Sequence, residues 1–190
     1  MVAELKEKRM WTYSELLARD DEQRVELYDG EIDEMGSPKV WHQELLFRMA
    51  VLLELWAREH DGGKVLMSPV DLYISEQQFL VPDLCFYSRA RVENERIERE
   101  DGQCLVAPPD LVVEIVSPSS ARNDRVRKTR LYAEFGVKHY WIIEPERQTL
   151  ETLELKDARY FLGATLTEED TLESSLFPGL QISLAALFQQ

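Results

Sequence analysis

The chain has little cysteine, little positive charge and no long apolar run. Cys85 and Cys104 are the only two cysteines in 190 residues and form no CxxC pair, which indicates free thiols of a cytoplasmic protein rather than a structural zinc site. No apolar run approaches the length of a membrane span, and residues 1–6 lack the apolar core of a signal peptide, so we expect no membrane partner. The chain also has no glycine-rich phosphate loop, no GxSxG elbow and no ordered Ser-His-Asp set.

The shortage of positive charge argues against broad nucleic-acid binding. The chain has 22 Lys and Arg against 36 Asp and Glu, a net charge of −14, whereas DNA-binding domains normally show a basic footprint. A local basic patch or bound metal ions could still offset this charge. The most basic short segment contains Arg122, Arg125, Arg127, Lys128 and Arg130. Such a cluster can contact phosphates, or it can be an ordinary solvated helix face.

Length and hydrophobic pattern predict one α/β (α+β) domain over residues 1–190, with a central mixed β-sheet between flanking helices and an N-terminal hairpin. Asp29-Gly30 is a strong two-residue turn signal for that hairpin. Long helices are expected at 41–59 and 122–135, on opposite sides of the sheet. The other predicted elements are strands at 25–28, 31–35, 64–67, 70–74, 80–87, 110–116, 139–144 and 150–155, short helices at 14–19 and 183–188, and a charged insertion at 89–101.

Two of the predicted strands carry an acidic residue in an apolar setting. Asp83 follows Pro82 at the start of one apolar segment, and Glu114 lies inside another, residues 111–116. With the two-residue period of a strand, Glu114 shares a face with Val112. Asp83 could simply begin a strand exposed to water, and Glu114 could pair with an arginine at the end of the sheet. Alternatively, two carboxylates on neighbouring strands can hold a divalent cation.

A lysine lies on the helix that follows. Asp124, Lys128, Leu131 and Phe135 are spaced i, i+4, i+7 and i+11, so Lys128 shares a face with the apolar stripe that packs on the sheet. In that position we expect it to reach a carboxylate or a substrate. The alternative is a surface ion pair between Lys128 and Asp124.

Three further polar residues are weaker candidates. His42 begins the inward stripe of the 41–59 helix, where it is either a hydrogen-bonded boundary residue or a participant in chemistry. Glu26 alternates with Val25 and Leu27 and could belong to a polar strand face. Asp71, in the 70–74 strand, is a similar and weaker candidate.

Taken in order, these segments resemble the Uma-type restriction-endonuclease family of the PD-(D/E)XK nuclease superfamily. The resemblance extends from about Arg24 to the C-terminus and is much more specific than Asp83 and Glu114 alone. The segments that carry it are residues 26–31, Pro82-Asp83, residues 109–119 and Tyr140-Trp141.

The resemblance implies a restriction-endonuclease-like fold and a metal-dependent endonuclease that hydrolyses phosphodiester bonds in DNA. Asp83 and Glu114 would bind Mg²⁺, or Mn²⁺ in its place, with the backbone carbonyl of Ile115 as a further ligand. The usual signature places its lysine two residues after the second acid, where this chain has Val116. The family resemblance implies that Lys128 replaces it from the next helix.

The same resemblance implies that Glu26 could be an additional metal or water ligand; His42 and Asp124 are further accessory candidates. Arg122, Arg125 and Arg127 are expected to contact DNA. By analogy with enzymes that cut two strands, we expect a homodimer. The net charge of −14 and the valine at the usual lysine position leave an alternative open, an inactive binding module that keeps the fold. A second alternative is a metal-dependent hydrolase of a small phosphorylated molecule.

Overall fold

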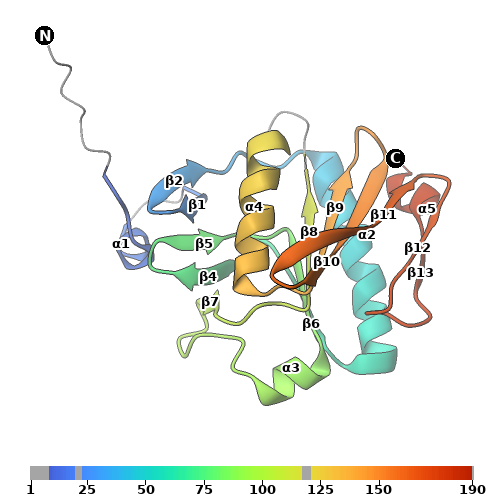
Figure 1. The fold of residues 1–190 in the computed structure, drawn as a ribbon, viewed down its shortest axis with the longest axis horizontal. Coiled ribbons are helices and arrows are strands. Elements are labelled where there is room, and N and C mark those ends of the chain that lie inside the picture. Colours follow the sequence, from blue (N-terminus) through green and yellow to red (C-terminus); the bar gives the residue numbers. More distant parts are fainter. Residues whose placement is uncertain (1–8, 20–22, 117–120, 190) are drawn as a thin grey trace, which may run out of the picture.

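The computed structural model describes residues 9–19, 23–116 and 121–189; for residue 61 and residues 121–124 it describes the backbone alone. The chain folds into a mixed α+β structure with two principal sheets, and helices flank the larger one (Figure 1). In the part of the chain that is described, no helix combines the length and apolar character needed to cross a membrane.

The larger sheet has six strands in the order β11-β10-β9-β8-β6-β3. Its central pair, β8 and β9, is parallel, and its other neighbouring strands pair antiparallel. A parallel pair needs a crossover connection, and helix α4 (Ala121–Phe135) supplies it. The strands are β3 Lys64–Met67, β6 Leu84–Tyr87, β8 Leu111–Ile115, β9 His139–Glu144, β10 Thr149–Lys156 and β11 Arg159–Thr167.

Helices cover both faces of this sheet. Helix α2 (Val40–Trp56) packs its buried side chains against Leu111, Val113 and Ile115 of β8. Helix α4 packs on the opposite face, where Val112 joins the core formed with Leu131 and Tyr132. The alternation predicted for this strand and the placement of the two helices on opposite sides are therefore confirmed. The arrangement is visible in Figure 1, with α4 in front of the sheet and α2 behind it.

The second sheet has five strands in the order β2-β1-β5-β4-β7. The predicted hairpin joins β1 and β2, and Asp29 and Gly30 both have positive φ (50° and 80°), as the turn requires. Helix α1 (Tyr13–Leu17) begins with a capping box formed by Thr12 and Glu15. The strands are β1 Val25–Tyr28, β2 Glu31–Glu34, β4 Asp71–Ser75, β5 Gln78–Leu80 and β7 Cys104–Leu105.

One predicted strand is wrong in a way that affects the site. The apolar pattern predicts a single strand over residues 80–87, but these residues are divided between β5 of the smaller sheet and β6 of the larger one. Pro82 lies in the link and has no N–H group for a ladder hydrogen bond. Asp83 therefore lies where the chain passes from one sheet to the other, immediately before β6.

Other elements differ from the prediction at their ends or are new. Helix α2 ends at Trp56 and continues as a π-helical turn, η1 (Ala57–Asp61), which stops at Gly62 with φ 69°. The charged insertion contains a short helix, α3 (Arg89–Asn94). Strands β7 and β11 and the hairpin of β12 (Thr171–Glu173) and β13 (Gln181–Ser183) are absent from the prediction. Helix α5 (Leu184–Phe188) follows the hairpin and is capped by Ser183.

Candidate active site

Four polar side chains from different elements border one cavity of about 650 Å³. Glu26 comes from β1 of the smaller sheet, Asp83 from the link between the sheets, Glu114 from β8 and Lys128 from α4. The strand alternation directs Glu114 to the α4 face, and the helical spacing directs Lys128 back toward it. The cavity therefore lies at the junction of the two sheets, under α4.

Lys128 is buried between two carboxylates. Its side chain is 10% exposed, and its Nζ lies 2.9 Å from Glu26 Oε1 and 3.1 Å from both carboxylate oxygens of Glu114. An ammonium group has three N–H donors, so these contacts can occupy all of them. Burial alone would lower the pKa of Lys128, but the negative charges of Glu114 and Glu26 outweigh it and hold the pKa well above its usual value. Lys128 is therefore a fixed positive charge in this site.

Glu114 is equally buried and is held by two donors. Its side chain is 6% exposed, and Oε1 accepts a hydrogen bond of 2.6 Å from the Tyr132 hydroxyl in addition to its contacts with Lys128. The pKa of Glu114 is raised to about 8, mainly by burial; the charge of Lys128 opposes this rise, and the nearby charges of Asp83 and Glu26 add to it. In the protein alone, the charge of Lys128 therefore does not fully offset the effect of burial on the ionised form of Glu114.

Glu26 is a buried, fully engaged carboxylate. Its Oε1 accepts a hydrogen bond from the Val81 amide (2.9 Å), and its Oε2 accepts one from the Tyr28 hydroxyl (2.7 Å). The residue is 4% exposed, so it does not lie on a solvent-facing strand surface. Since its Oε1 also lies 2.9 Å from Lys128 Nζ, the geometry suits Glu26 to holding Lys128 in place.

Asp83 is tied to the strand that carries Glu114. Its Oδ2 accepts a hydrogen bond of 2.8 Å from the Ile115 amide and lies 3.2 Å from His42 Nε2. The two acidic residues are therefore linked through the backbone of β8. His42 Nδ1 and the Tyr140 hydroxyl are buried and have no hydrogen-bond partner within the described residues, although both residues border the cavity.

The donor chemistry fits a hard divalent cation. Among the described residues no group of three or more His, Cys, Asp or Glu side chains is placed to hold a metal ion, whereas the two carboxylates of Asp83 and Glu114 border the same cavity. Mg²⁺ is commonly bound through one or two carboxylates and keeps several waters. In addition, burial raises the pKa of Glu114 to about 8, and a cation beside its carboxyl group would favour the ionised form.

The cavity is much less acidic than the whole chain. Five cationic and five anionic side chains line it, against 22 and 36 in the full sequence. The basic segment predicted on α4 contributes to this balance, because Arg125 and Arg127 border the cavity. The full charged lining consists of Arg24, Lys39, Arg125, Arg127 and Lys128 with Glu26, Asp33, Glu34, Asp83 and Glu114.

Some candidate residues lie elsewhere or cannot be placed. The side chains of Arg122 and Asp124 lie outside the described residues. Asp71 does not line this cavity and accepts a hydrogen bond of 2.9 Å from Tyr13. Sequence reasoning missed Tyr28 and Tyr132 as partners of the two glutamates. A signal was available for both, since Tyr132 follows Lys128 by four residues on one helix face and Tyr28 follows Glu26 by two residues on one strand face.

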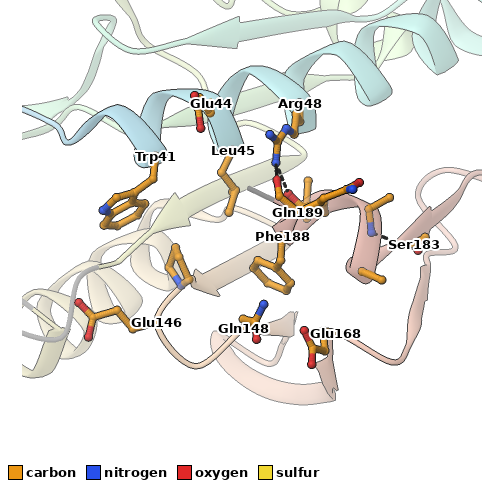
Figure 2. Close-up of a pocket in the computed structure, with 14 residues that line it drawn as sticks. Trp41, Glu44, Leu45, Arg48, Glu146, Gln148, Glu168, Ser183, Phe188 and Gln189 are labelled. Atoms are coloured by element: carbon orange, nitrogen blue, oxygen red, sulfur yellow. Dashed lines mark hydrogen bonds between the residues drawn. The ribbon is translucent and has the colours of Figure 1, made fainter.

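A larger cavity of about 900 Å³ lies between α2 and α5. Figure 2 shows Arg48 reaching from α2 toward the end of the chain, where it donates hydrogen bonds to the carbonyl oxygens of Leu187 and Gln189. Glu44, Glu146 and Glu168 also border this cavity. It does not bring paired carboxylates together with a buried ammonium, so its size does not make it the better candidate.

Comparisons with known proteins bear on the family and the fold of this chain. The chain is 32% identical over 124 residues to "Uncharacterized protein slr1290" of Synechocystis sp., and the match covers 63% of this chain and about 60% of that protein. A crystal structure of "a putative nuclease belonging to DUF820" from Anabaena variabilis shares the fold, with a TM-score of 0.74, 18% identity and coverage of 93% of this chain and 97% of that one. The model of the Uma2 family, described as "Putative restriction endonuclease", matches residues 11–185, and the chain therefore belongs to this family, as its ordered segments predicted.

Proposed function

We propose that this protein is a metal-dependent endonuclease that hydrolyses phosphodiester bonds in DNA. The observation that carries the proposal is the buried Lys128, held 2.9–3.1 Å from Glu26 and Glu114 in a cavity that Asp83 also borders. Burying three charged groups together is costly, and their concentration in one cavity is typical of a functional site. Membership of a family described as restriction endonucleases supports phosphodiester hydrolysis as the reaction.

In this proposal Asp83, Glu114 and the carbonyl oxygen of Ile115 hold Mg²⁺, with Mn²⁺ as a substitute. A bound cation of this kind would make a water molecule more acidic and stabilise negative charge on the phosphate. Lys128 Nζ keeps its proton and supplies a fixed positive charge beside the reacting phosphate. Glu26 positions Lys128, and His42 positions Asp83 through the 3.2 Å contact.

The cationic rim of the cavity would bind the DNA backbone. Arg127 is exposed and its guanidinium lies 5.1 Å from the centre of the Tyr28 ring, whereas Arg125 forms an ion pair with Glu151. Phosphate contacts of this kind position DNA without reading its sequence. The local balance of charge offers a way for an acidic chain to bind a polyanion.

The test is a DNA cleavage assay with Mg²⁺ or Mn²⁺. Asp83→Asn keeps the shape of the side chain and removes one ligand charge, so we expect cleavage to fall by at least about 100-fold, as for loss of a major electrostatic group in an active site. Asp33→Asn is the matched control, because Asp33 is another carboxylate of the same cavity with no proposed metal contact. Its cleavage rate should stay close to that of the wild type.

A wild-type protein that cleaves no DNA with either metal would contradict the proposal. The net charge of −14 and Val116 would then favour a binding module that kept the fold. Cleavage that is equally lost in Asp83→Asn and Asp33→Asn would also contradict the proposed role of Asp83 as a metal ligand. A small phosphorylated substrate would be indicated by hydrolysis of a phosphodiester model compound without any cleavage of DNA.

A further inference from the structure

The outer face of α2 carries an exposed apolar stripe. Val40 is 77% exposed, Phe47 62%, Val51 37% and Leu55 55%. With 3.6 residues per turn these four side chains lie along one line, opposite the face that packs on the sheet. From Val40 to Leu55 the stripe is about 22 Å long at 1.5 Å per residue. The solvent face of a surface helix normally carries polar residues, and a contiguous apolar patch marks an interaction site.

We propose that this stripe is the interface with a second copy of the chain, in which the two α2 helices pack antiparallel about a twofold axis at Val51. With a twofold axis at position 51, a residue that lies a given number of positions before Val51 faces the residue that lies the same number of positions after Val51 in the partner helix. Phe47 then lies opposite Leu55 of the partner subunit, and the apolar residues of the two stripes meet at the centre of the contact.

The charged residues beside the stripe match the same symmetry. Glu44 lies seven residues before Val51, and Arg58, in the π-helical turn that continues α2, lies seven after it, which brings Glu44 near Arg58 of the partner subunit. Arg48 does not add a second pair, because its guanidinium donates hydrogen bonds to the carbonyl oxygens of Leu187 and Gln189 within the same subunit. An isologous contact repeats every pair, so the interface contains the Glu44–Arg58 pair twice.

The pairing within one copy does not compete strongly with this arrangement. Arg58 contacts Glu54 at 2.6 Å, but this is an i, i+4 pair whose arginine side chain is 74% exposed. Exposed pairs of this kind are weak and rearrange easily. Glu44 has no ion partner within the described residues. A polyanion does not fit this face, because its charges are balanced and its centre is apolar, whereas a second copy is complementary to both features.

Cysteine cross-linking tests the axis directly. Helices in contact are about 8–10 Å apart, and subtracting two backbone radii of about 2.3 Å leaves Cα atoms at the axis about 4–5 Å apart. That separation lies near the range that a disulfide spans. Val51→Cys should therefore form a covalent dimer under mild oxidation, detected on a non-reducing gel. The native Cys85 and Cys104 are buried and should not interfere.

The matched control is Val126→Cys, since Val126 is 69% exposed on α4, outside the proposed interface. This variant should stay monomeric on the same gel. If Val51→Cys cross-links no faster than Val126→Cys, the proposed contact is wrong.

A charge-reversal series tests the pairing. Glu44→Arg and Arg58→Glu each place like charges opposite one another, so each should raise the dimer dissociation constant several-fold in sedimentation equilibrium. The double variant restores opposite charges across the axis and should recover most of the wild-type affinity. Both residues are exposed, so circular dichroism and thermal melts should show folded variants. A monomeric wild type, or a double variant as weak as the single ones, would overturn the proposal, and neither outcome depends on DNA cleavage.

Discussion

At the scale of single residues, two buried tyrosines beside Glu114 differ in one respect. The Tyr132 hydroxyl donates a hydrogen bond of 2.6 Å to Glu114, whereas the buried Tyr140 hydroxyl has no partner within the described residues. Their rings touch, with centroids 5.1 Å apart, so the two residues share the same packing environment. A buried polar group without a partner costs free energy, while one with a partner stabilises the fold modestly.

The matched substitutions to phenylalanine should therefore act in opposite directions. Tyr132→Phe leaves Glu114 with one donor fewer and should lower the free energy of unfolding by about 1–3 kcal/mol. Tyr140→Phe removes the unpartnered hydroxyl and should leave the free energy of unfolding unchanged or raise it by about 1 kcal/mol. Urea unfolding of the protein without metal measures both. Equal losses in the two variants would mean that the Tyr140 hydroxyl has a partner in solution.

Much of the site could be predicted residue by residue, because period and spacing set direction. The two-residue period placed Glu114 on the same face as Val112, and helical spacing turned Lys128 toward the sheet, as the structure has them. The contact of Glu26 with Tyr28, two residues along the same strand, follows from that period as well, but its other partner does not. Its contact with the Val81 amide joins residues 55 positions apart, and no local pattern reports such a pairing.

At the scale of elements, α4 presents arginines in two different settings. Arg127 borders the site cavity, whereas Arg130, three residues later, lies outside its lining and pairs with Asp29 and Glu134. If α4 contacts DNA phosphates beside the site, only the first of these arginines should matter. Arg127 and Arg130 lie on the same helix, carry the same charge and are both exposed, so they differ mainly in whether they border the cavity.

Arg127→Ala should weaken DNA binding and flatten its dependence on salt, because each phosphate contact releases condensed counterions. We expect the slope of log K against log salt to decrease in magnitude by about 0.9 for duplex DNA. Arg130→Ala should leave the slope unchanged. Fluorescence anisotropy across a salt series, with Ca²⁺ present to prevent cleavage, measures both. Equal slopes for Arg127→Ala and the wild type would remove α4 from the DNA interface.

The start of β8 is held to the segment around α3 by another buried carboxylate, Asp110. It accepts a hydrogen bond of 2.9 Å from the Ser88 amide, and its Oδ1 lies 3.2 Å from Arg91 Nε. Burial alone would raise the pKa of Asp110, but the hydrogen bonds from Ser88 and the charge of Arg91 outweigh it and lower the pKa. The pKa of Asp110 is lower in the folded protein than in the unfolded chain, so its ionised form stabilises the fold at pH values above the ordinary carboxyl pKa. This contribution is lost as the pH falls through the lowered pKa of the folded protein.

Asp110→Asn should therefore lower the free energy of unfolding by about 1–3 kcal/mol at neutral pH. The difference from the wild type should shrink as pH falls below the usual aspartate value of 3.8. Urea unfolding at a series of pH values measures this. Glu93→Gln is the control, because Glu93 pairs with Arg89 on the exposed surface and should matter little at any pH. A difference that does not vary with pH would assign the loss to packing instead of charge.

Strand existence was easier to predict than strand partnership. Residues 80–87 are continuously apolar apart from Pro82 and Asp83, so periodicity alone favours one strand, although its two halves belong to different sheets. Strand β11 escaped prediction because its side chains are mostly exposed at the edge of the sheet and therefore show no apolar alternation. The division of residues 80–87 between two sheets and the pairing of β11 both depend on tertiary contacts, which the local sequence pattern does not report.

At the scale of the whole molecule, the site depends on the meeting of two sheets. Glu26 belongs to one sheet and Glu114 to the other, and Lys128 links them from α4. The protein as a whole carries a net charge of −14, so cations in general should reduce its self-repulsion. A specific metal site must therefore be distinguished from the general effect of salt on an acidic protein.

Mg²⁺ should raise the melting temperature through the site and not only through screening. A ligand bound only by the native state at about ten times its dissociation constant adds about 1.4 kcal/mol, which corresponds to roughly 3–6 °C for a chain of this size. Thermal melts with Mg²⁺ and with NaCl of equal ionic strength measure the specific part. Asp83→Asn should lose that part, whereas Asp33→Asn should keep it, because both remove one negative charge from the same cavity but only Asp83 is linked to the Glu114 strand. An equal response in both variants would mean that Mg²⁺ acts on the charge of the whole chain, since screening does not distinguish one carboxylate from another.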